Sequence, residues 1–214
     1  ETVPNHLGQV VIVDVLFVLA ECFSNLPSVR FLHSLHRGGE IALYPEDSPP
    51  WMEQVSPHSQ YPLPALKELV TGYTGNCLMD LTHPAFAGRR FDENFGRRHG
   101  SDDVYFSAAH RAGASFGRAE AAFVYEPVLP ERLSFQWLLK RRYHYGQAHA
   151  CISQRTRGWL ATSAAAKATY CAGAAALSVF SPTQYRKALL RGALHLGVMA
   201  GALGTPAEEV YGTS

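Results

Sequence analysis

Two adjacent carboxylates, Asp102 and Asp103, follow a glycine and a serine and precede an apolar run that is typical of a helix. This pattern predicts both side chains at a helix N-terminus, where free backbone N–H groups and the helix dipole favour the ionised form. An ionised carboxylate at the edge of a cleft accepts a proton from a hydroxyl nucleophile, as a general base does. The alternative is plain helix capping, because Ser-Asp-Asp is ordinary capping sequence. Asp103 and Asp102 are the candidate catalytic residues.

The segments around this acidic pair come in a fixed order: FDENFG before it, AHRAG after it, then AAFVYEPV and PERLSFQWLLKRRYHYG. Together they resemble the C-terminal half of family 2 glycosyltransferases. The chain is most similar to the bacterial succinoglycan type, which extends lipid-linked exopolysaccharide repeats. The resemblance is good over residues 70–150, moderate over 151–212 and poor over 1–60. It implies a GT-A-like (Rossmann-like) α/β fold, with Asp103 as general base and Asp102 in place of the family's usual Glu.

The same resemblance implies a site for the donor nucleotide. Family members carry a basic and aromatic signature on a helix after the catalytic pair. Arg141 and Arg142 occupy the similar place here, with Arg132 one helix start earlier. Their guanidinium groups suit a departing diphosphate because the planar fork binds phosphate oxygens bidentately; the alternative is a solvated helix face. Asp14, at the end of VVIVD, is similar to the family's strand-end acid that contacts the nucleoside, and a strand-ending turn Asp is the alternative.

Three residues are candidates for the acceptor side of the cleft. Gly75 and Asn76 match a Gly-Asn that many family members carry near the acceptor. Trp51 follows two prolines in an expected loop, where its ring is suited to stack on a sugar or to act as a hydrophobic plug.

A divalent cation, Mg²⁺ or Mn²⁺, is implied by the resemblance, but its ligands are not in their expected place. Relatives hold the cation that bridges the diphosphate with an Asp-x-Asp after an Arg-Gly-Gly region. Here Arg37-Gly38-Gly39 runs almost directly into IALYPEDSPPW, which in relatives lies well after that motif. Glu46 and Asp47 are the nearest acids, in a different context. The metal ligands therefore stay unassigned.

The elements that position these candidates read as an α/β body followed by helices. We expect a mixed sheet flanked by helices over residues 1–131, with parts of the donor-binding half missing, and a basic helical region over 132–214 that ends in a helical hairpin. The expected strands cover residues 9–15, 26–33, 69–81 and 121–128; the expected helices after the body cover 133–150, 156–180 and 183–204; residues 44–64 are expected to form a long loop rich in Pro and Ser.

Charge is unevenly distributed along the chain. The formal net charge is +1, yet residues 132–207 contain ten Lys or Arg and no Asp or Glu. A basic tail after an acidic body indicates an anionic partner, for which a membrane surface fits better than nucleic acid, because no nucleic-acid motif is present. The alternative is a solvated face packed against the acidic body. The longest uncharged part of 156–180 is too short to cross a bilayer, which favours helices lying at the surface.

Cys22, Cys77, Cys151 and Cys171 show neither a CxxC pair nor metal-ligand spacing, as expected of reduced thiols in the cytoplasm. The N-terminal residues have no signal-peptide pattern. The sequence therefore predicts an inverting glycosyltransferase that moves a hexose from a nucleotide-diphosphate sugar, expected to be a UDP-sugar, to a lipid-linked or polysaccharide acceptor. We expect it at the inner face of the cytoplasmic membrane. The alternative is a shortened, non-catalytic binding or assembly protein.

Overall fold

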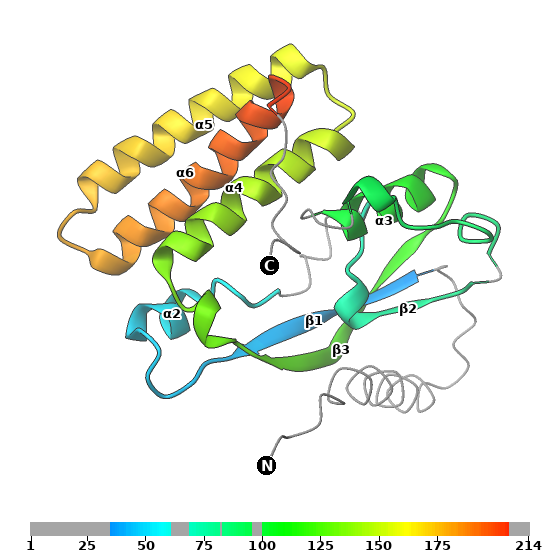
Figure 1. Cartoon of the computed structure of the whole chain (residues 1–214), viewed down its shortest axis with the longest axis horizontal. Helices are drawn as coiled ribbons and strands as arrows, with labels where there is room; N and C mark the ends of the chain where they lie inside the picture. Colours follow the sequence, from blue (N-terminus) through cyan, green and yellow to red (C-terminus); the bar gives the residue numbers. More distant parts are fainter. Residues whose placement is uncertain (1–34, 61–68, 82, 96–99, 206–214) are drawn as a thin grey trace.

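The computed structural model describes residues 35–60, 69–81, 83–95 and 100–205. A small sheet with one helix beside it forms one part of the molecule, and three long helices form the other (Figure 1). The mixed α/β character predicted from the sequence is confirmed. The strands expected at residues 9–15 and 26–33, and with them Asp14, lie outside the described residues.

The sheet has three strands in the order β2-β1-β3. β1 (Leu35–Leu43) pairs antiparallel with β2 (Cys77–Met79) and parallel with β3 (Phe116–Pro127). The register between β1 and β3 shifts around Gly38, where a Cβ atom would collide with the Asn76 side chain and the Ala122 carbonyl. The sequence did not predict β1, since its two consecutive glycines are unusual in a strand interior and hid the pattern.

α3 (Ser101–Arg111) is the helix predicted to follow the acidic pair. It buries Phe106 and Ala109 completely, and Phe106 meets Phe116 of β3 edge to face, with ring centroids 6.3 Å apart. At its N-terminus, Gly100 adopts a φ of 96°, which favours glycine. A Cβ atom there would collide with that of Ala148, so the missing side chain lets the start of α3 lie directly against the next helix.

That next helix, α4 (Phe135–Ile152), belongs to a three-helix layer with α5 (Arg157–Leu177) and α6 (Pro182–Ala202). The predicted hairpin of α5 and α6 is present, but α6 also packs along α4 and lies between the two (Figure 1). Gly146 and Gly197 allow this contact, because a Cβ atom on either would strike backbone atoms of the opposite helix. No helix in the described part of the chain has the length and apolar content needed to cross a bilayer.

The segment predicted as a long loop, residues 44–64, contains a short helix, α2 (Pro50–Val55). Proline at the first position of a helix favours a helix start. The sequence predicted a loop here because the segment is rich in Pro and Ser. Met52 is fully buried and Trp51 is 8% exposed, and both join a cluster with Leu138 of α4 and Leu190 of α6. α2 therefore links the sheet region to the helical layer.

Candidate functional site

A pocket of about 530 Å³ lies where the body meets α4. Five residues that the sequence predicted for catalysis and diphosphate binding line it: Asp102, Asp103, Arg132, Arg141 and Arg142. The aspartates come from the first turn of α3, and the arginines come from α4 and the short helix η3 (Pro130–Arg132) before it. The fold thus places the two predicted groups, which are separated in sequence, around one cavity.

Hydroxyl donors from one loop hold the acidic pair. Thr71 Oγ1 donates to Asp103 Oδ1 at 2.9 Å, while Thr74 donates to Asp102 Oδ2 through its backbone N–H at 3.2 Å and its Oγ1 at 2.9 Å. The residue at the N-cap is Gly100, which has no side chain to cap the helix. The two carboxylates therefore fix the loop beside the pocket instead of serving as the N-cap of α3.

Burial raises the pKa of the Asp103 carboxyl above its ordinary value. The hydrogen bond from Thr71 opposes this shift, the negative charge of Asp102 reinforces it, and the guanidinium of Arg37 opposes it. Because a base with a raised pKa holds an abstracted proton more strongly, this environment favours Asp103 as a proton acceptor.

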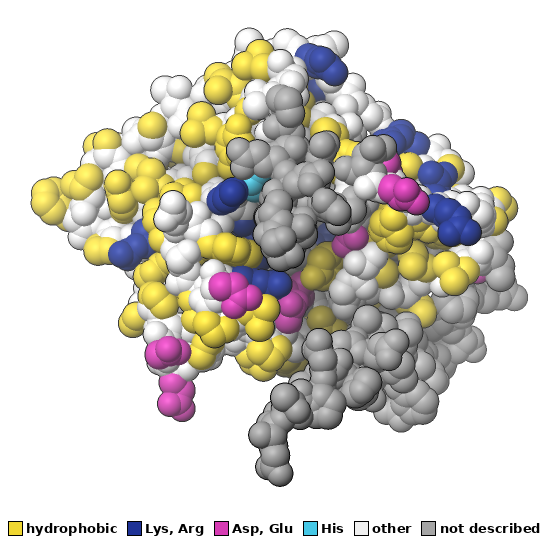
Figure 2. Space-filling view, in the orientation of Figure 1, with side chains coloured by type: hydrophobic (Ala, Val, Ile, Leu, Met, Phe, Trp, Pro, Cys, Tyr) yellow, Lys and Arg dark blue, Asp and Glu magenta, His cyan; other side chains and the backbone are white. Residues whose placement is uncertain are grey.

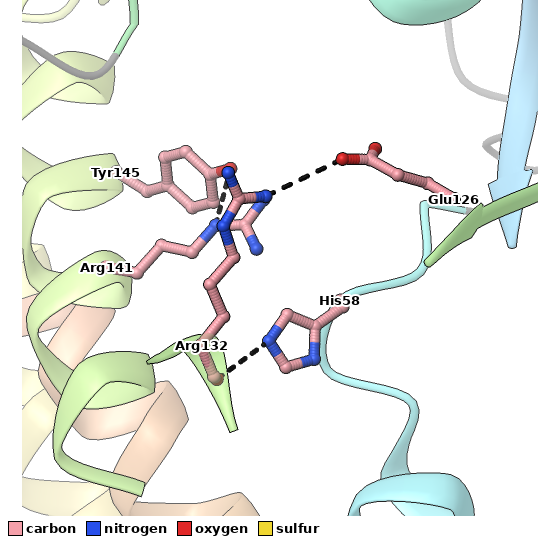
Figure 3. Close-up of polar contacts among 5 residues, drawn as sticks. All are labelled: His58, Glu126, Arg132, Arg141 and Tyr145. Atoms are coloured by element: carbon pink, nitrogen blue, oxygen red, sulfur yellow. Dashed lines mark hydrogen bonds and ion pairs between the residues drawn. The ribbon is translucent and has the colours of Figure 1, made fainter. Parts of the chain in front are cut away.

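Guanidinium groups line the opposite wall of the pocket, and Figure 3 shows two of them with their partners. The Arg132 guanidinium lies 3.6 Å from the Glu126 carboxylate, and both side chains are partly exposed. Arg141 Nε donates to the Tyr145 hydroxyl at 2.9 Å, and its guanidinium lies over the Tyr145 ring. Arg142 Nη2 donates to the Pro57 carbonyl at 3.0 Å. Each arginine is thus held in place by one neighbour, which pre-organises the wall for an anion.

His58, which also lines the pocket, holds the backbone of Arg132 (Figure 3). Its Nε2 donates to the Arg132 carbonyl oxygen at 3.2 Å, so its Nδ1 accepts from the Tyr44 hydroxyl at 3.0 Å. Burial and the charge of Arg141 lower the His58 pKa to about 4, which keeps the ring neutral at pH 7. A neutral His58 holds the η3 backbone in place without adding charge to the arginine cluster.

A second pair of carboxyl groups, Glu40 of β1 and Glu126 of β3, stands beside the arginines. Glu40 is 5% exposed, and burial together with a hydrogen bond to the Glu126 carboxyl raises its pKa to about 7, while a hydrogen bond with Tyr73 opposes the shift. Two carboxyl groups that hydrogen bond to each other need a proton between them. The pair therefore carries a single negative charge when that proton is held.

The residues predicted for the acceptor side do not line this pocket. Asn76 is 1% exposed and its Nδ2 donates to the carbonyl oxygens of Gly39 and Ala122, so it joins β1 to β3. A Cβ atom on Gly75 would strike the Tyr73 ring, which explains the glycine by packing. The Trp51 ring meets Phe135 edge to face inside the α2 cluster. Its expected loop position was wrong, and this packing favours the hydrophobic plug over stacking on a sugar.

The ligands of the expected divalent cation stay unassigned among the described residues. No three His, Cys, Asp or Glu side chains in this part of the chain are close enough together to hold one. Glu46 and Asp47 lie in the turn before α2 and do not line the pocket. Among the described residues, arginine side chains supply the positive charge that lines the pocket.

Comparison with known proteins gives the sequence a relative of stated role. The chain is 37% identical over 176 residues to the succinoglycan biosynthesis protein ExoM of Rhizobium meliloti (strain 1021). The chain is related to a succinoglycan biosynthesis protein. This confirms the succinoglycan-type resemblance that the sequence predicted. The alignment covers 80% of the chain and 57% of ExoM, so the chain spans just over half the length of this relative. No protein-family model and no solved structure matches the chain.

Within the region that the structure describes, sequence analysis missed several residues of the pocket wall. Glu126 stands in the AAFVYEPV segment that carried the resemblance, so its place there was a usable signal. Arg37, Glu40, His58, Tyr73 and Tyr145 also contribute to the pocket or its support. Arg37 and Tyr145 stand in segments that the resemblance includes, but no role was predicted for them, and the pairing of β1 with β3 and the packing of α4 bring all five together.

Proposed function

We propose that the chain belongs to a family 2-like, GT-A-like inverting glycosyltransferase of exopolysaccharide biosynthesis. It moves a hexose from a nucleotide-diphosphate sugar, a UDP-sugar, to a hydroxyl group of a lipid-linked or polysaccharide acceptor. One observation carries the proposal: Asp103 and three arginines line a single pocket. The relation to ExoM supports polysaccharide biosynthesis as the setting.

In this mechanism, Asp103 accepts the proton of the acceptor hydroxyl while the hydroxyl oxygen attacks the anomeric carbon of the donor sugar. The bond between that carbon and the diphosphate breaks as the new bond forms on the opposite face, which inverts the configuration. Asp103 suits this role because Thr71 holds one carboxylate oxygen, and the raised pKa of the carboxyl favours the proton transfer.

The leaving diphosphate gains negative charge as the glycosidic bond breaks. Arg132, Arg141 and Arg142 surround the opposite wall and are already held by Glu126, Tyr145 and Pro57, respectively. Pre-organised cations of this kind stabilise developing charge without having to reorganise during the reaction. A Mg²⁺ or Mn²⁺ ion would neutralise the diphosphate further when bound. We assign none of the described residues to it.

Calorimetric titration with UDP, with and without Mn²⁺, tests the proposal. Saturable binding that is weakened by Arg142→Ala and unchanged by Arg186→Ala supports a nucleotide site, because Arg186 lies over the Trp51 ring outside the pocket. A transfer assay with UDP-hexoses and a lipid-linked glycan acceptor then tests turnover. If the protein binds no UDP under either condition, the glycosyltransferase proposal fails and the non-catalytic alternative stands.

A further inference from the structure

Helix α5 has two apolar faces, and within the described structure only one of them is covered. The covered face packs on α6 through Leu160, Ala164, Cys171 and Ala175, which are all buried. The other face carries Trp159, Tyr170 and Leu177, at spacings of eleven and seven residues that place them on one side of the helix. Phe180 continues this face in the turn between α5 and α6.

Exposure on this second face is far above what large apolar side chains usually show. Phe180 is 99% exposed, Leu177 is 89% exposed and Tyr170 is 73% exposed. Scattered single apolar residues on a surface need no explanation, but a row along one helix marks a contact with an apolar phase or a partner. We call Trp159, Tyr170, Leu177 and Phe180 the outer α5 face.

Charge on and around the outer α5 face is sparse and of one sign. The helix itself contains only two charged residues, Arg157 at its start and Lys167 near its middle, and residues 132–205 contain no Asp or Glu. The Arg155 guanidinium lies 4.9 Å from the centre of the Trp159 ring. In Figure 2 the surface over α5 and its turn is largely hydrophobic, with few charged side chains beside it.

This combination fits a lipid surface. Trp and Tyr are favoured at the boundary between headgroups and hydrocarbon, and Lys or Arg beside them is attracted to anionic headgroups. A helix with an apolar face and basic flanks lies in the plane of that boundary. We propose that the outer α5 face and the turn to α6 bind an anionic lipid bilayer, with α5 parallel to its surface and Leu177 and Phe180 inserted below the headgroups.

This proposal restricts the membrane binding that the sequence predicted for the whole segment 132–214 to one face of one helix. Many side chains of α4 are used by the pocket and by packing on α6, and α6 lies between α4 and α5 (Figure 1). No residue of α5 lines the pocket. Lipid binding is therefore separable from nucleotide binding, and the proposal stands independently of the proposed function.

Sedimentation of the full chain with vesicles tests it, using phosphatidylcholine alone and phosphatidylcholine mixed with phosphatidylglycerol. We expect binding to the anionic vesicles that weakens as salt is added, because the Lys and Arg contribution is screened. Leu177→Ser combined with Phe180→Ser should lower binding by about tenfold or more, since two inserted apolar side chains are lost. Lys167→Glu should lower binding to the anionic vesicles by about fivefold.

Leu81→Ser is the matched control, because Leu81 is 66% exposed but lies in the body after β2. This variant should bind vesicles as the unmodified protein does. The proposal is overturned if the unmodified protein does not sediment with anionic vesicles, or if the double variant binds them equally well. It is also overturned if the unmodified protein is a dimer, the double variant is a monomer and neither protein binds lipid. The outer α5 face would then be a protein interface.

Discussion

The two walls of the pocket hold their carboxyl groups in opposite ways. On the α3 wall, Asp102 and Asp103 are neighbours in sequence, yet each accepts hydrogen bonds from its own threonine. On the other side stand Glu40 of β1 and Glu126 of β3, with arginines beside them, which we call the strand wall; these two carboxyl groups hydrogen bond to each other. Hydroxyl donors stabilise a charged carboxylate, whereas a shared proton stabilises a pair with a single charge.

These two ways of stabilising carboxyl groups suit the walls to different roles. On the α3 wall, Thr71 donates to the Asp103 carboxylate while burial raises the pKa of that carboxyl group, which favours Asp103 as a proton acceptor. On the strand wall, the raised pKa of Glu40 favours a proton held between the two carboxyl groups, which limits the negative charge beside Arg132 and the nearby arginines. The net field on that side stays positive, as an incoming diphosphate requires.

The general-base role of Asp103 is tested by Asp103→Asn, which keeps the shape of the side chain but removes the proton acceptor. Turnover should fall by about 10²–10⁴-fold while UDP affinity stays nearly the same. Asp102→Asn should have a smaller effect, because its carboxylate mainly holds Thr74. Steady-state transfer assays on both variants decide the matter, and a more severe loss from Asp102→Asn would move the base role to that residue.

On the strand wall, Glu40→Gln tests whether the carboxyl pair shares a proton. Because the pKa of Glu40 is raised from 4.5 to about 7 in the folded protein, the folded state holds a proton that the unfolded state has lost across this range. Stability of the unmodified protein should therefore fall as pH rises from about 4.5 to 7. The difference corresponds to up to about 3 kcal/mol relative to the variant. Urea unfolding at a series of pH values measures it.

The partner residue supplies the control for this prediction. The hydrogen bond to Glu126 is the second cause of the raised pKa after burial. In a Glu126→Gln background, Glu40→Gln should consequently produce a smaller change in the pH dependence of the unfolding free energy. Equal slopes in the unmodified protein and the Glu40→Gln variant would show that the pKa of Glu40 is not raised in the folded protein.

The role of the arginines that line the pocket is tested by Arg142→Ala. UDP affinity should fall by about 1.5–3 kcal/mol, the range for hydrogen bonds to charged groups, as measured by calorimetry. Arg142→Lys should restore only part of this loss, because an ammonium group lacks the planar fork. Arg186→Ala should leave the affinity unchanged, and equal losses from both alanine variants would indicate a diffuse field in place of a defined site.

The elements that sequence analysis found are those whose signals are local. The spacing of apolar residues predicts four helices, which are α3, α4, α5 and α6. Thr156 and Pro182 mark the starts of α5 and α6. Asp102 and Asp103 followed from the same local pattern together with the family resemblance. For these residues, short-range sequence was sufficient.

The missed features depend on contacts between distant segments. β1 contains two glycines whose purpose appears only when Asn76 and Ala122 are seen beside Gly38. Glu40 reaches Glu126 only because β1 and β3 pair in parallel, which local sequence does not specify. Trp51 had two interpretations from its sequence, and its packing on Phe135 favours the hydrophobic plug. Tertiary pairing decided each of these cases.

The smallest expected effect comes from Thr71→Val, which removes the donor to Asp103 Oδ1 and keeps the size of the side chain. That hydrogen bond lowers the pKa of Asp103, so its loss should raise the pKa further and leave less ionised base at acidic pH. The acidic limb of the profile of kcat against pH should move to higher pH. Turnover should fall on the acidic side of the profile and stay nearly unchanged on its plateau.

Thr74→Val is the matched control for this shift, because Thr74 Oγ1 donates to Asp102. The backbone N–H of Thr74 continues to bind Asp102 in that variant, so the loop keeps one of its two anchors. Its acidic limb should coincide with that of the unmodified protein, since the carboxyl group of Asp103 keeps its own donor. A shift in Thr74→Val without one in Thr71→Val would mean that Asp102 accepts the proton. The two aspartates on the α3 wall would then exchange roles while the strand wall kept its own.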